Sequence, residues 1–112
     1  MPLNGSLSNE NSLTVLCRVE PGCLGPDGKD HIEGFCLFAQ KAMPLIAPKF
    51  VSWIIVPRYD KTLPEIQYQI NDRKLTFPQF GKYLEMLERD PEEFSTQLDD
   101  NLARLIDRYL AR

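Results

Sequence analysis

The sequence predicts an α+β fold in which helices pack on a small three-stranded sheet. Three observations support this: short segments with a two-residue apolar period, longer segments with apolar residues three and four apart, and connections rich in proline and glycine. The expected order is strand, helix, strand, strand, helix, helix, ending in a C-terminal helical hairpin. The 112 residues suit one domain, placed at 13–112, and residues 1–12 are predicted to be a disordered N-terminal tail.

The first strand is predicted at residues 13–19, where apolar residues largely alternate with polar ones until a turn that contains Pro21. A helix follows, with apolar residues spaced by three and four over residues 32–43. Pro44 is expected to end or kink this helix near residue 43, because a proline ring clashes with the preceding turn and supplies no amide donor.

Residues 50–56 are almost entirely apolar and rich in β-branched and aromatic side chains, which predicts a central strand covered on both faces. Residues 66–70 alternate strictly, so their three apolar residues are expected to face the core and both glutamines to face water. Asn71-Asp72 favours a tight turn, after which residues 73–75 can return as a short edge piece. If the first two strands are adjacent and parallel, the helix between them forms a right-handed crossover.

Thr76 and Gln79 have the spacing of a capping box, which predicts a helix that runs to about Arg89. Asp90-Pro91 then supplies a cap and a first-turn proline for the last helix. The long apolar stripe of that helix must be buried somewhere. Packing on the preceding helix and pairing in a homodimer are both open at this stage.

Composition bounds the location and the partners of the chain. Three cysteines, an odd number, fit reduced thiols better than a secreted disulfide scaffold. The first twelve residues lack a basic start and an apolar stretch, so no secretory signal is expected. No apolar run approaches the roughly 20 residues of a membrane span. We therefore predict a soluble cytoplasmic protein without a membrane partner.

The net charge of −3 offers no general attraction for nucleic acid, but the charges are unevenly distributed. Residues 41–82 carry seven basic and three acidic groups, whereas residues 85–112 carry four basic and eight acidic groups. Such a split can close the molecule on itself, pair two copies or attract a charged partner.

The best candidate for a binding site is Arg58, Tyr59, Asp60 and Lys61, directly after the second predicted strand. A loop at a strand end can present donors, an acceptor and an aromatic face to a ligand or peptide. The alternative is a solvated loop whose tyrosine covers the edge of the core.

A second candidate is a metal site made by Cys17, Cys23, His31 and Cys36, which carry the ligand atoms that zinc prefers. Their spacings, Cys-x5-Cys and His-x4-Cys, do not match those of compact zinc sites, and the last two would lie about 140° apart on a helix. We therefore expect Cys17 and Cys36 to be buried as small hydrophobes, and keep the metal site only as the alternative.

The turn from Gly22 to Lys29 is rich in glycine and precedes a helix, where exposed amides could hold phosphate. The spacing of its glycines departs from the phosphate-binding pattern, and Asp27 and Asp30 would repel an anion. An ordinary connecting loop is the favoured interpretation.

No nucleophile with a base partner is evident, so the sequence leans against an enzyme and predicts no cofactor. The leading hypothesis is a small non-enzymatic protein-interaction or adaptor domain that binds a protein partner or itself. It would use the basic region near Trp53, Tyr59 and Tyr68, or the acidic last helix. The alternatives are a metal- or small-ligand-binding domain built on the Cys/His-containing half, and a nucleic-acid-binding domain that uses residues 41–82.

Overall fold

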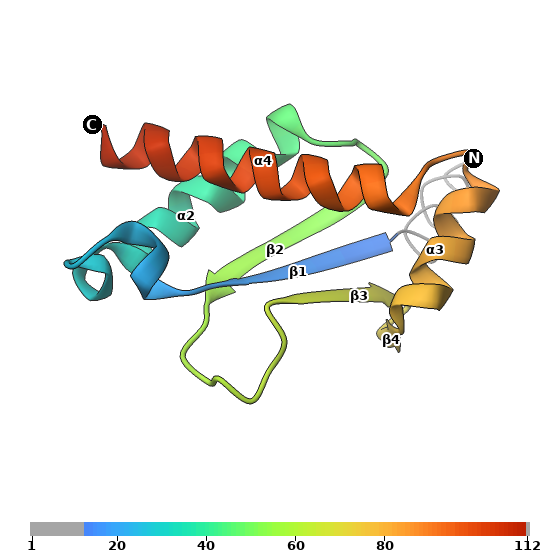
Figure 1. Ribbon diagram of the computed structural model, residues 1–112, viewed down its shortest axis with the longest axis horizontal. Helices are drawn as coiled ribbons and strands as arrows, with labels where there is room; N and C mark the ends of the chain where they lie inside the picture. The colour runs from blue at the N-terminus through green and yellow to red at the C-terminus, as the bar shows by residue number, and fades with distance from the viewer. Residues whose placement is uncertain (1–12, 112) are drawn as a thin grey trace, which may run out of the picture.

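The computed structural model describes residues 13–111, and the predicted tail at residues 1–12 lies outside this part. Figure 1 shows a sheet with helices gathered on one side of it, which confirms the α+β class. The elements, in chain order, are β1 (Leu13–Val19), a short 3-10 helix η1 (Pro21–Leu24), α2 (Gly28–Ile46), β2 (Val51–Pro57), β3 (Ile66–Ile70), β4 (Arg73–Leu75), α3 (Phe77–Met86) and α4 (Pro91–Leu110).

The sheet is mixed and has the strand order β2-β1-β3-β4. β1 runs parallel to β2 and antiparallel to β3, and β3 pairs antiparallel with β4. The expectation of three strands is corrected to four, because residues 73–75 pair as a full strand. Asn71 and Asp72 permit this by adopting positive φ angles of 53° and 66°, which make the tight turn that the sequence indicated.

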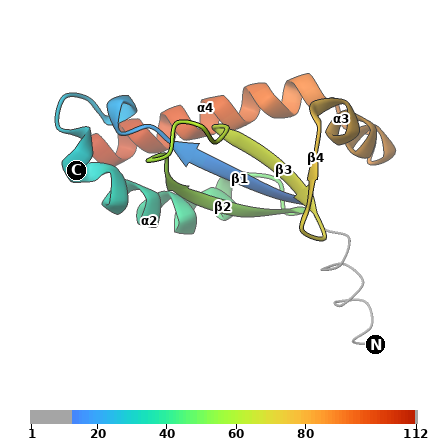
Figure 2. The ribbon, with the colours of Figure 1, turned by 90° about the horizontal axis from the view of Figure 1, so that it is seen from below.

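One face of the sheet carries the core. Val15 of β1 lies in register between Trp53 of β2 and Tyr68 of β3. Trp53 stacks on Phe94 of α4 with ring centres 6.1 Å apart, and Tyr68 stacks on Phe80 of α3 at 3.8 Å. Seen from below in Figure 2, α4 lies behind the strands, and no helix of the described residues lies in front of them.

The prediction that residues 50–56 form a central strand covered on both faces is wrong. β2 is an edge strand, and its alternate residues Ser52 and Ile54 are exposed on the open face. The expectation that both glutamines of β3 face water is wrong for Gln67, which is only 8% exposed and accepts a 3.2 Å hydrogen bond from Arg18. The apolar run at residues 50–56 therefore did not show that both faces of β2 are covered, and the alternation at residues 66–70 did not show that Gln67 is exposed.

The free edge of β2 is closed by a side chain of α2. Gln40 donates through Nε2 to the carbonyl oxygen of Trp53 at 2.6 Å and accepts through Oε1 from the amide of Ile55 at 2.8 Å. These are backbone groups that another strand would need to extend the sheet. Pro57, at the end of β2, has no amide hydrogen to offer at all.

Helix α2 continues past Pro44 to Ile46, so of the two expected effects of this proline, an end or a kink near residue 43, the end at residue 43 is not found. The proline lies in the last turn of the helix, so it removes one backbone hydrogen bond and only two helical residues follow it. The amide of Ala47 donates to the carbonyl of Met43 at 3.0 Å and closes this end. Helix α3 begins at the predicted capping box and ends at Met86, earlier than expected.

The apolar stripe of α4 is largely covered within the chain. Phe94, Leu98 and Leu105 are buried, and Tyr109 near the end of the helix packs edge-on against Phe35 of α2 at 5.7 Å. The sequence predicted a C-terminal hairpin in which α4 packs on the preceding helix, but α4 contacts α2 more extensively than α3, and α3 meets it only near its start. The stripe therefore needs no second copy of the chain to hide it.

Candidate functional site

The carboxyl ends of β1 and β2 lie side by side at one end of the sheet, because the two strands are adjacent and parallel. At this end β1 leads into η1 and the glycine-rich turn, and β2 leads into the loop of residues 58–65. Loops at this end of parallel strands are frequent binding positions. We call this region the strand-end surface.

Glu20 organises the strand-end surface. Its carboxylate accepts hydrogen bonds from the guanidinium of Arg58 and from the ammonium of Lys61. Arg58 also donates through Nε to the carbonyl of Leu63 and through Nη2 to the carbonyl of Lys61, both at 3.1 Å. The bonds from Lys61 and Arg58 lower the pKa of the Glu20 carboxyl. Arg58 therefore holds the loop in shape in addition to lining the surface.

A hollow of about 480 Å³, here called the loop hollow, opens between this loop and the start of α2. It brings together two candidates of the sequence, since the loop and the glycine-rich turn both line it. Its lining residues are Glu20, Pro21, Gly22, Lys29, Arg58, Tyr59 and Lys61.

Asp60, the remaining residue of the predicted binding set, does not line the loop hollow. Its carboxylate accepts from the hydroxyl of Thr62 at 2.6 Å and from the amide of Thr62 at 2.9 Å, and these bonds lower the pKa of Asp60. Tyr59 is 62% exposed and donates to a carboxylate oxygen of Glu33 at 2.8 Å, which raises the pKa of the phenol. Tyr59 thus offers a ring face beside the cations and does not cover the core.

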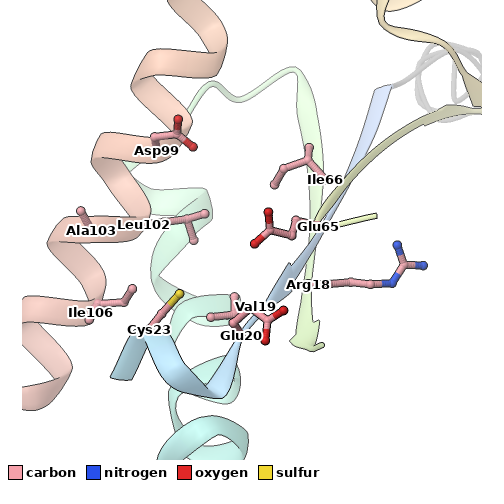
Figure 3. Close-up of a pocket in the computed structure, with 10 residues that line it drawn as sticks. All are labelled: Arg18, Val19, Glu20, Cys23, Glu65, Ile66, Asp99, Leu102, Ala103 and Ile106. Atoms are coloured by element: carbon pink, nitrogen blue, oxygen red, sulfur yellow. The ribbon is translucent and has the colours of Figure 1, made fainter. Parts of the chain in front are cut away.

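A second hollow, of about 260 Å³, lies between α4 and the ends of β1 and β3 (Figure 3). We call it the α4 hollow. Half of its lining is aliphatic, and three carboxylates and a thiol stand among these side chains. The lining residues are Arg18, Val19, Glu20, Cys23, Glu65, Ile66, Asp99, Leu102, Ala103 and Ile106.

The charged side chains of the α4 hollow differ in how they are used. Glu20 is already paired, whereas Glu65 and Asp99 form no ion pair with any residue in 13–111. Figure 3 shows the guanidinium of Arg18 directed away from the hollow, where it donates to the carbonyl of Pro64 at 2.8 Å. The hollow is therefore apolar inside and negatively charged at its rim.

The four candidate metal ligands are not brought together. Cys17 and Cys36 are buried, as expected, and burial raises the pKa of these thiols to about 12 and about 11. Cys23 is exposed in the α4 hollow, and His31 lies edge-on to Tyr109 at 6.4 Å. Within the described residues no three Cys, His, Asp or Glu side chains are placed to hold a metal ion.

The basic groups of residues 41–82 do not form one surface. Lys41 lies on the outer side of α2, and Arg73 lies in the short strand β4. The loop with Lys61 follows β2 beyond the end of β1, whereas Arg73 pairs with Ile70 of β3, which in turn pairs with Leu13 at the start of β1. The leading hypothesis placed a binding surface near Trp53, Tyr59 and Tyr68. Of these, Trp53 is only 6% exposed and belongs to the core.

Comparison with protein-family models, curated proteins and solved structures finds no match to this chain. Over residues 13–111 no helix has the length and apolar character that a bilayer crossing requires. The fold and the two hollows therefore carry the functional argument by themselves.

Proposed function

We propose that the chain is a non-enzymatic protein-interaction domain that binds an acidic segment of a partner protein at the loop hollow. The observation that carries the proposal is the lining of this hollow, which contains three cations, one carboxylate and an exposed tyrosine ring. A cationic surface with an aromatic face is a common composition for recognising acidic peptides.

The balance of charge supports an acidic occupant. Glu20 is shared by Arg58 and Lys61, so one carboxylate faces two cations. Lys29, at the start of α2, forms no ion pair with any residue of the described chain. The lining of the loop hollow therefore has an excess of positive charge, in a protein whose net charge is −3. An acidic side chain that approached Lys29 would find a cation without displacing an existing pair.

Binding of fluorescein-labelled peptides to the full chain tests the proposal by fluorescence anisotropy at low ionic strength. The two probes are a glutamate-rich peptide and the same peptide with glutamine in place of glutamate. The glutamate peptide is expected to bind more tightly. Lys29→Gln is expected to weaken its binding about two- to fivefold, the range for one exposed charge pair.

The matched control is Lys41→Gln, which removes the same charge from the exposed side of α2 away from the hollow. This variant is expected to bind like the unaltered chain. Equal binding of both peptides, or equal weakening by Lys29→Gln and Lys41→Gln, would show that the loop hollow does not select an acidic segment.

A further inference from the structure

We propose that the α4 hollow is a second recognition site, which binds a lysine or arginine side chain of a partner protein. The hollow combines an aliphatic interior with unpaired carboxylates at its rim. A long basic side chain has the same two parts, an apolar stem and a charged head. The site shares only Glu20 with the loop hollow, so the inference does not rest on the function proposed above.

The interior of the hollow fits the stem of such a side chain. Leu102 and Ile106 lie one turn apart on α4 and form one wall, and Ile66 of β3 contributes to the opposite wall. All three are only partly buried in the chain itself, so an occupant would remove further apolar surface from water. The volume of about 260 Å³ accommodates one long side chain rather than a nucleotide or a folded element.

The rim fits the charged head. Glu65 precedes β3 and Asp99 lies on α4, so the two free carboxylates come from opposite walls of the hollow. A cation held between them would meet negative charge from both sides, while Arg18 directs its own charge elsewhere. An acidic occupant would instead meet uncompensated repulsion, which makes the site selective for a basic group.

The chain contains its own reporter for occupancy. Cys23 lines the hollow and is exposed, whereas the other two of the three cysteines are buried. Figure 3 shows its sulfur directed toward the space between α4 and β1. A side chain that fills the hollow is therefore expected to shield Cys23 from a small uncharged thiol reagent.

The experiment measures the rate at which N-ethylmaleimide modifies Cys23 in the full chain, with the site of modification confirmed by mass spectrometry. The probe is a blocked Gly-Arg-Gly peptide, and its control is the same peptide with citrulline, which has nearly the same shape without the charge. At ten times its Kd the arginine peptide leaves about one-tenth of the sites free, so the rate is expected to fall to about one-tenth. The citrulline peptide is expected to leave the rate nearly unchanged.

Two variants separate binding from nonspecific charge effects. Glu65→Gln combined with Asp99→Asn removes both free carboxylates with little change of shape, and is expected to abolish protection by the arginine peptide. Asp100→Asn combined with Asp107→Asn removes the same charge from α4 outside the hollow and is expected to retain protection. Equal protection by the citrulline peptide, no protection by the arginine peptide, or protection that survives Glu65→Gln with Asp99→Asn would overturn the proposal.

Discussion

Replacing Gln40 with leucine is expected to destabilise the chain by opening the edge of β2. Gln40 makes two hydrogen bonds to this edge, at 2.6 and 2.8 Å, and each is worth about 0.5–1.5 kcal/mol. The freed carbonyl of Trp53 and amide of Ile55 can partly reach water at an edge, so the expected loss is about 1–2 kcal/mol. For a domain of this size the loss corresponds to a fall in Tm of about 4–8 °C.

Urea unfolding followed by tryptophan fluorescence measures this loss, because Trp53 is the sole tryptophan and its carbonyl is one of the two groups released. Leucine keeps the helix propensity of position 40, so α2 itself is not weakened. Lys41→Leu is the control, since it adds the same side chain at the exposed neighbouring position. An unchanged urea midpoint for Gln40→Leu, or an equal loss in Lys41→Leu, would refute the role assigned to Gln40.

Three further outcomes are expected. Gly28→Ala should lower the free energy of unfolding, measured with urea, by about 1–3 kcal/mol or more, because the added Cβ would lie 1.7 Å from a backbone oxygen of η1. Gly22→Ala is the control: its Cβ would meet nothing within 4 Å, so it should be nearly neutral. Burial holds the pKa of Cys17 and Cys36 at about 12 and 11, above the ordinary 9.0, so stability should hold below pH 9 and fall toward pH 12. Replacing both cysteines with alanine should flatten this fall in urea midpoints. Because the pKa of Glu20 is lowered from 4.5, its support of the loop after β2 should be present above pH 4.5 and lost as the pH falls, and Glu20→Gln should remove this dependence in amide hydrogen exchange.

Elements with local signals were predictable from the sequence. The capping box works as expected, since Thr76 Oγ1 accepts from the amide of Gln79 and Gln79 Oε1 accepts from the amide of Thr76. Asp90 likewise caps α4 by accepting from the amide of Glu92 at 3.0 Å. In each case the partners lie within three residues of one another, so the hydrogen bonds depend on the local backbone alone.

Features that depend on packing between distant segments were not predictable in the same way. Ile54 belongs to an apolar run, yet its exposure depends on β2 being at the edge of a sheet with one open face. Gln67 alternates like a surface residue, but Arg18, which contacts it from another strand, helps to bury it. Alternation shows which residues share a face, and it does not show what lies over that face.

The candidate site was partly predictable for the same reason. Arg58, Tyr59 and Lys61, which line the loop hollow, could be proposed together from the sequence because they are neighbours in the chain and follow a strand. Glu65 and Asp99 were missed, since 34 residues separate them and nothing in their spacing relates them. Only the packing of α4 across the sheet brings them to one hollow, and that packing is a property of the whole fold.

Glu20 lies between the two hollows, so its substitution cannot distinguish binding at one hollow from binding at the other. It lines both hollows and also holds Arg58 and Lys61, so Glu20→Gln would alter the loop and both binding surfaces together. Lys29 belongs to the loop hollow alone, and Glu65 with Asp99 belongs to the α4 hollow alone. If one partner segment occupied both hollows, a variant that combines Lys29→Gln with Glu65→Gln and Asp99→Asn would bind this segment more weakly than a variant altered at either hollow alone. Two unrelated partners would each respond to only one of these changes.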